Sequence, residues 1–267
     1  NLANTYQRQY QADPDAYSGR LADALDTIRR AEAIAANDPR VQNLKGLVLY
    51  QLGDLQQARE ALEQAVTLAA TSQTLENRDR SIVQVNLGRV YRDLGELELA
   101  QQTFRRAVVL DPTSAQAHNH LGFTSYRLGD CETAEYELSQ AVNLDPNSLD
   151  AAANLGIVLF ECGNVQASLP RLERAVQMDG AVFLPPLFTY LARAYLETGQ
   201  VDEAIRRAQH GALLSVPPSA EAYYWLGQSY QRRGQSGDAQ LARDAYQRAV
   251  EIDPNFTAAQ EALRSLQ

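Results

Sequence analysis

The sequence predicts an all-α solenoid built from antiparallel helix pairs. Three observations predict it: Asp-Pro pairs spaced 34 residues apart, glycines that recur at fixed places between them, and apolar residues at helical spacing. Asp111-Pro112 and Asp145-Pro146 mark the spacing, and Asp253-Pro254 ends a later copy. A fixed period of about 20–50 residues is typical of repeat proteins, in which each copy is one structural unit that stacks on the next.

The N-terminal part of the chain predicts an arm followed by half a repeat. Residues 1–12 are rich in Gln and Asn and lack a helical apolar stripe, so we expect a flexible arm. Residues 13–38 predict a helix, with Asp13 as its N-cap and Pro14 in its first turn. No basic and apolar leader pattern remains in the chain, and we expect any signal peptide to have been removed before Asn1.

Six full repeats follow, each with a first helix, A, and a second helix, B. A small residue such as Gly88 lets helix A approach its partner closely, and Ala100 and Ala134 leave room where helices cross. A glycine such as Gly95 suits the turn between the helices, where φ is usually positive. Proline stops helix B because it lacks an N–H group. The predicted repeats span 39–72, 81–114, 115–148, 149–182, 185–218 and 220–256.

The remaining segments fit the same solenoid. Residues 255–267 predict a terminal capping helix that covers the last apolar face, as solenoids require. Residues 73–80 are inserted between two repeats, and we expect them either to extend the flanking helices or to form a surface loop. In the last repeat Gly234 and Gly237 both fit the turn glycine. We therefore expect residues 13–267 to form a single solenoid domain.

The composition excludes several classes of protein. The chain has 267 residues, of which 45% are hydrophobic and 21% charged, too apolar a mixture for a disordered chain. No apolar run approaches the 18 or so residues that a membrane span requires. The net charge of −9 argues against nucleic-acid binding, which needs a basic surface to neutralise phosphates.

The histidines, the cysteines and the motifs of the sequence do not predict an enzyme. His118 and His120 are two residues apart, so on a helix they point about 200° apart and do not share a metal ion. The chain carries no zinc-type cysteine or histidine motif, no phosphate loop and no nucleophile elbow. We predict no catalytic residue, no metal site and no cofactor.

The repeated positions resemble the tetratricopeptide repeat over nearly the whole chain. In one copy they are Leu87-Gly88, Tyr91, Gly95, Ala100, Phe104, Ala107 and Pro112. The resemblance implies a right-handed superhelical solenoid that acts as a scaffold binding another protein. It also implies that positions 2, 5, 9, 12 and 13 of helix A line the concave face, and this spacing keeps them on one side of a helix.

These positions carry apolar and aromatic side chains interleaved with arginines. Such a surface suits a helical or extended peptide that presents apolar and acidic groups. The predicted partner-binding residues are Leu47, Tyr50, Val85, Arg89, Arg92, Asn119, Phe123, Tyr126, Arg127, Asn154, Ile157, Phe160 and Arg193. Partial burial against neighbouring A helices is the alternative. The same choice applies to position 6, where Asn86, Asn154 and His120 either bond a ligand's backbone or serve the fold.

The two cysteines give information about the cellular compartment of the protein. Cys131 falls in the first turn of one helix B, and Cys162 falls at the end of the next helix A, at the same edge of a solenoid. We consider a disulfide between them, with two free thiols as the alternative. A bridge would favour an oxidising compartment.

The repeat count, the length and the polar arm resemble the pilotin-type lipoproteins of type IV and Tad pilus systems. The resemblance implies a periplasmic scaffold at the bacterial outer membrane, tethered by a lipid on a cysteine upstream of Asn1, that helps a secretin to assemble. Two alternatives stay open: a cytoplasmic scaffold for a multiprotein complex, and an adaptor that delivers substrates to a hydrolase.

Overall fold

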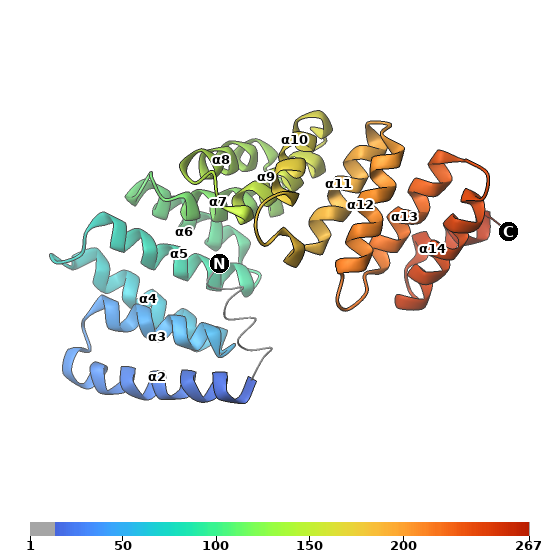
Figure 1. Ribbon diagram of the computed structural model, residues 1–267. Helices are drawn as coiled ribbons and strands as arrows, with labels where there is room; N and C mark the ends of the chain where they lie inside the picture. Colours follow the sequence, from blue (N-terminus) through green and yellow to red (C-terminus); the bar gives the residue numbers. More distant parts are fainter. Residues whose placement is uncertain (1–13, 267) are drawn as a thin grey trace. The chain divides into compact units, whose positions relative to one another are not determined.

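The structure, a computed structural model, describes residues 14–266 and confirms an all-α fold (Figure 1). The described residues form fourteen α-helices and no strand. The predicted arm and the predicted cap Asp13 lie outside them. The helices are α2 (Pro14–Ala35), α3 (Pro39–Gln51), α4 (Leu55–Thr71), α5 (Asn77–Asp93), α6 (Leu97–Leu110), α7 (Ala115–Arg127), α8 (Cys131–Leu144), α9 (Leu149–Glu161), α10 (Val165–Val176), α11 (Pro185–Glu197), α12 (Val201–Leu214), α13 (Ala220–Arg233), α14 (Asp238–Ile252) and α15 (Thr257–Ser265), with a 3-10 turn at Ala181–Phe183.

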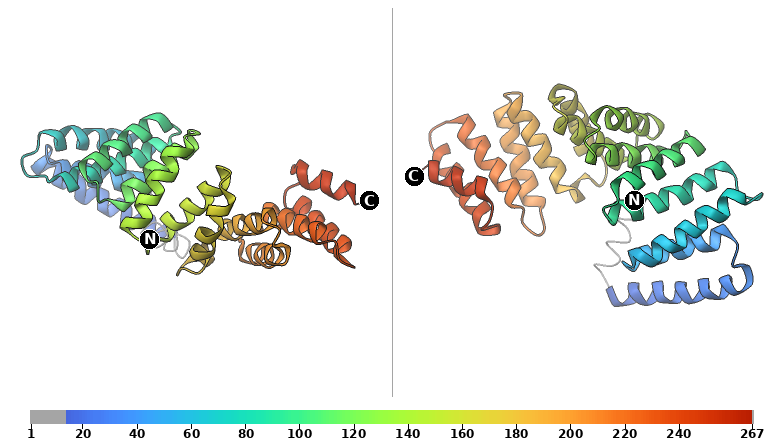
Figure 2. Two further views of the ribbon diagram at one scale, coloured as in Figure 1. Left: turned by 90° about the horizontal axis from the view of Figure 1, so that it is seen from above. Right: turned by 180° about the vertical axis from the view of Figure 1, so that it is seen from behind.

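The chain divides into two compact bodies, residues 1–137 and residues 138–267. We call them the N-terminal body and the C-terminal body. Within each body successive helices pack side by side (Figures 1 and 2). Alternate helices also touch: α3 contacts α5 and α5 contacts α7 in the first body, and α9 contacts α11 and α11 contacts α13 in the second. The A helices of each body therefore form an inner layer. The single continuous domain stays a prediction.

Glycine has the two predicted roles within a repeat. A Cβ atom on Gly88 of α5 would lie 2.6 Å from Cε1 of Phe104 on α6, closer than side chains approach. Only glycine therefore lets these two helices pack at this distance. Gly95 lies in the turn between them with φ of 82°, a value that side chains disfavour.

The insertion after the first repeat both forms a loop and lengthens a helix. α4 ends at Thr71 and α5 begins at Asn77, so residues 72–76 form the loop. The other A helices begin at the first position of their repeat, whereas α5 begins four residues earlier. Residues 77–80 thus add one helical turn to the N-terminus of α5.

The described chain ends in a short helix, α15. α15 packs on the C-terminal body through Ala259, which is buried, and through Ala262 and Leu263, which contact the core around Tyr246. In the last repeat Gly234 ends α13 and Gly237 precedes α14, and both have positive φ. The three added residues are accommodated in this turn.

Candidate functional site

The inner face of the N-terminal body is presented by α3, α5 and α7. Local signals fix where these helices begin: the Asp38 side chain accepts from the N–H of Arg40 at the start of α3, and Ser114 accepts from the N–H of Ala117 at the start of α7. The helix start sets which residues face inward, because side chains three and four apart share one side of a helix.

A polar network joins α3 to α5 on this face. Asn86 donates through Nδ2 to Oδ1 of Asn43 at 2.9 Å. The Tyr50 hydroxyl donates to the Asp93 carboxylate, which also pairs with Arg92 at 2.9 Å. Burial, together with this hydrogen bond, raises the pKa of Tyr50. The Asn86 contact is a bond within the protein, as the structural alternative for position 6 expects.

Arg89 is held differently from Arg92. Its guanidinium lies 4.8 Å from the centre of the Tyr50 ring, a cation–π distance. Among the described residues it forms no ion pair with a carboxylate. Arg127, at the end of α7, is exposed and also has no ion-pair partner in the described part of the chain. Two of the predicted arginines are therefore available to an acidic ligand.

Apolar side chains occupy other positions of the same helices. Leu47, Tyr50, Phe123 and Tyr126 are partly exposed, and the rings of Phe123 and Tyr126 lie 6.1 Å apart. Leu44 and Ile82 add exposed aliphatic surface, with 52% and 46% of their side chains accessible. Val85 and Asn119 are buried instead, and Val85 belongs to the core of the body.

The two neighbouring histidines of α7 have opposite environments. His118 is buried between Glu137, 2.5 Å from Nδ1, and the carbonyl of Pro112, 3.0 Å from Nε2. The hydrogen bond to Glu137 raises the pKa of His118. His120 stacks on Phe104 at 5.2 Å, and desolvation together with Arg92 and Arg89 lowers its pKa to about 3. His120 is thus neutral and packs as an aromatic side chain.

The inner face of the C-terminal body is organised around Arg193 of α11. Its guanidinium lies 4.6 Å from the Phe160 ring, 5.0 Å from the Tyr190 ring and 5.0 Å from the Trp225 ring. It also pairs with Glu161 at 3.0 Å, and Glu221 lies 3.9 Å away. Arg193 is therefore committed to contacts inside the protein.

The other predicted residues of this body contribute less surface. Phe160 is buried in the core, and Asn154 and Ile157 are partly exposed. The sequence prediction missed Tyr190 and Trp225, which lie at position 6 of their repeats. At this position the sequence analysis considered only asparagine and histidine. Trp225 is the only tryptophan of the chain, and that rarity on an inner helix was a signal for it.

The cysteines lie at the predicted helix ends. Cys131 is the first residue of α8 and Cys162 caps the C-terminus of α9. Neither is a free thiol in the described part of the chain. Their pairing with each other stays a prediction.

Two further properties concern the described residues alone. No group of three or more His, Cys, Asp or Glu side chains within residues 14–266 is placed to hold a metal ion. Among the same residues, no helix combines the length and the apolar character needed to cross a bilayer.

Comparison with solved structures shows the same fold at low identity. The chain of the APC/C hetero-tetramer Cut9–Hcn1 matches with a TM-score of 0.72 and 17% identity; the match covers 98% of this chain but only 51% of that one. PilW, a widely conserved type IV pilus biogenesis factor, matches with a TM-score of 0.69 and 20% identity over 84% of this chain and 98% of PilW. YrrB, a TPR protein with an unusual peptide-binding site, matches with a TM-score of 0.61 and 21% identity over 77% of this chain and 99% of YrrB. At these identities the likeness shows the fold alone.

The family is shown by the sequence itself. No curated protein sequence is similar enough to this chain to count as a match. Two family models, both described as tetratricopeptide repeat, match residues 37–113 and residues 85–148 and 191–255, which together exceed half of the chain. The chain therefore belongs to the tetratricopeptide-repeat family, whose stacked helix pairs serve as scaffolds for protein–protein interaction.

Proposed function

We propose that this protein is a non-enzymatic scaffold whose A-helix face binds a helical or extended segment of a partner protein. The observation that carries the proposal is Arg89, a guanidinium held over the Tyr50 ring with no carboxylate partner in the described chain. The Arg89 side chain is already ordered by its contact with the ring. A ligand carboxylate therefore pairs with it at a smaller loss of side-chain conformational entropy.

The surroundings of Arg89 define the expected ligand. Leu47, Phe123 and Tyr126 offer partly exposed apolar surface, and Arg127 adds a second unpaired cation. A segment that alternates apolar and acidic side chains would satisfy both. Aromatic and arginine side chains are also the types that most often dominate binding energy at interfaces.

The test is a measurement of partner affinity with charge variants. The partner is first captured from the native organism, and its dissociation constant is then measured by calorimetry. Replacing Arg89 and Arg127 together by Gln should weaken binding by about tenfold or more, since a hydrogen bond to a charged group is worth about 1.5–3 kcal/mol. Arg29→Gln with Arg30→Gln, an adjacent exposed pair on α2, is the matched control. Equal affinity of both double variants would contradict the proposal.

The pathway that we propose is the assembly of a pilus or its secretin at the bacterial outer membrane, in the periplasm, with a lipid tether upstream of Asn1. Its support is architectural: the repeat count, the length and a fold similar to that of PilW. Removing the protein from its host should reduce secretin multimers and surface pili, measured by gel electrophoresis and electron microscopy. Normal multimers and pili in its absence would direct attention to the cytoplasmic scaffold or the hydrolase adaptor.

A further inference from the structure

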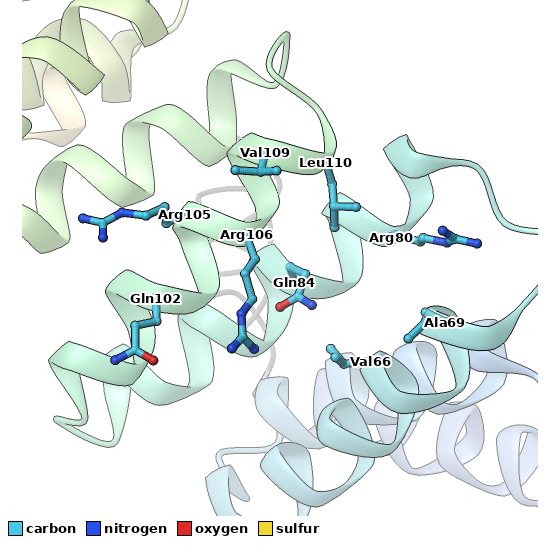
Figure 3. A pocket seen from close by; sticks show the side chains of 10 residues that line it. Val66, Ala69, Arg80, Gln84, Gln102, Arg105, Arg106, Val109 and Leu110 are labelled. Atoms are coloured by element: carbon cyan, nitrogen blue, oxygen red, sulfur yellow. The ribbon is translucent and has the colours of Figure 1, made fainter.

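The N-terminal body has a cavity away from the A-helix face. Helices α4, α5 and α6 line an open cavity of about 630 Å³ (Figure 3). This volume lies within the range of about 300–1,000 Å³ that is typical of ligand sites. None of the thirteen predicted partner-binding residues lines it.

The cavity lies between two consecutive B helices and beside the insertion. α5 packs against both α4 and α6, while these two B helices make no contact as extensive with each other. The inserted loop and the added turn of α5 lie at one end of the resulting gap. Arg80, the last residue of that turn, donates through Nη2 to the Ser72 carbonyl at 2.7 Å and so ties the turn to the loop. The inserted segment therefore borders the cavity.

The lining combines aliphatic surface with positive charge. Val66 and Ala69 of α4 face Leu110 and Arg106 of α6 across the gap, as Figure 3 shows. Val109, at the rim, is 75% exposed. Such aliphatic surface open to water is favourable to cover.

The charged side chains that line the cavity are all positive. Arg80, Arg105 and Arg106 line the cavity, and no carboxylate does. None of these three arginines forms an ion pair with another residue in the described chain. In a protein whose net charge is −9, three unpaired arginines around one apolar cavity indicate an anionic occupant.

A buried acceptor narrows the class of occupant further. Oε1 of Gln84, which lies on α5 at the floor of the cavity, is buried and has no hydrogen-bond partner among the described residues. A buried acceptor without a partner costs about 1–3 kcal/mol. Nε of Arg80, which also lines the cavity, is a buried donor without a partner among the described residues. A fatty acid carboxylate would satisfy only this donor, whereas a peptide supplies backbone N–H groups for Gln84 as well as acceptors for Arg80. The open rim also suits a chain that continues past the cavity.

We propose that this cavity is a second docking site, which takes a peptide segment of a partner protein with an aliphatic side chain between acidic residues. The aliphatic side chain packs between Val66 and Leu110, a backbone N–H donates to Oε1 of Gln84, and the acidic side chains pair with Arg105 and Arg106. The site stands apart from the A-helix face and does not depend on it.

The test is selection of a displayed library of random dodecapeptides on the full chain. Selected peptides should combine aliphatic and acidic residues. The affinity of the best peptide, synthesised and measured by fluorescence anisotropy, should fall tenfold or more with Arg105→Gln plus Arg106→Gln. It should fall to a similar extent with Ala70→Leu, which fills the cavity at an exposed position without changing charge. Gln84→Leu should weaken it several-fold.

Two control variants on α2 test whether a loss of affinity is specific to the cavity. Arg29→Gln plus Arg30→Gln removes the same charge from an adjacent exposed pair on α2, and Ala33→Leu makes the same change in size there. Both should leave the peptide's affinity unchanged, and far-ultraviolet circular dichroism confirms that each variant is helical. Failure to select any peptide that depends on Arg106 and Ala70 overturns the proposal. So does a peptide that loses affinity only with Arg89→Gln plus Arg127→Gln, because it belongs to the A-helix face.

A further arm separates a peptide from a small amphiphile. Sodium dodecanoate, below its micelle concentration, is titrated against the wild type and the Arg105→Gln plus Arg106→Gln variant. We expect no competition with the bound peptide at concentrations that leave the fold intact. Arginine-dependent binding of dodecanoate in the absence of any selected peptide would identify a lipid-like ligand and overturn the peptide proposal.

Discussion

Arg89 and Arg193 occupy the same position, the ninth, of two different repeats, yet their surroundings differ completely. In the N-terminal body Arg89 lies over one ring and lacks a carboxylate partner among the described residues. In the C-terminal body Arg193 is surrounded by three rings and paired with Glu161. The difference teaches that a repeat position fixes where a side chain points and leaves its role to its neighbours. One arginine is available for binding, while the other stabilises its own body.

The first prediction concerns the cysteines, one of which lies in each body. A bridge between Cys131 and Cys162 would close a loop of 31 residues, for which the chain-entropy model gives about 3.5 kcal/mol. Reduction should therefore lower the free energy of unfolding by about that amount. Thiol titration of protein purified from its native compartment without reductant checks the premise. Two free thiols there would remove the bridge and the argument for an oxidising compartment.

The second prediction is a pH dependence that originates in the N-terminal body. The pKa of His120 is lowered to about 3, so below about pH 6.5 the unfolded chain binds a proton that the folded chain does not. Stability should therefore fall with acidification, by up to about 1.4 kcal/mol per pH unit, until about pH 3. His120→Asn, which introduces the residue found at this position in two other repeats, should flatten this part of the curve.

His118 has the opposite sign and a different pH range. Its pKa is raised by the Glu137 hydrogen bond, so its contribution is complete below about pH 6.5 and is lost as the pH rises through its folded-state pKa. Wild-type stability should accordingly peak near pH 6.5 in urea titrations, and His118→Gln should remove the decline on the alkaline side. An unchanged pH profile in both variants would show that neither environment exists in solution.

The comparison of the two arginines gives the third prediction. Arg193→Ala removes ring stacking and an ion pair and should destabilise the protein by about 1.5–3 kcal/mol. Arg89→Ala removes a single cation–π contact and should cost only about 0.5–1 kcal/mol. Urea unfolding followed by far-ultraviolet circular dichroism, which reports on the helices of both bodies, measures both. Equal losses of stability would end the distinction between a structural and a binding arginine.

The last prediction concerns Asn86. Its hydrogen bond to Asn43 is neutral and lies within the protein, so Asn86→Ala should cost about 0.5–1.5 kcal/mol of stability. Partner affinity should not change, provided that the experiment is done where the variant is fully folded. Weaker binding by the folded variant would instead make Asn86 a ligand contact, as in the alternative for position 6.

The sequence by itself determined the repeat architecture. The spacing of Gly88, Gly95, Ala100 and Pro112 predicts helix pairs and their turns, because each residue has a local steric role. Gly88 permits close helix approach and Gly95 a positive φ, while Ala100 fits a tight helix crossing and Pro112, without an N–H group, ends a helix. The helices of the structure follow this spacing, and the capping helix α15 follows it too. Local rules of this kind repeat with the sequence and can be read from it.

Only the tertiary structure decided which of the inward-facing side chains are exposed and without an ion-pair partner among the described residues. Val85 and Phe160 lie at face positions of their helices but are buried by neighbouring repeats, and Arg193 is paired by residues from α9 and α13. The cavity between α4 and α6 was likewise not predicted, although the insertion beside it was recognised. Burial and pairing depend on side chains that are distant in sequence, so a repeat pattern places a residue on a face without specifying what covers it.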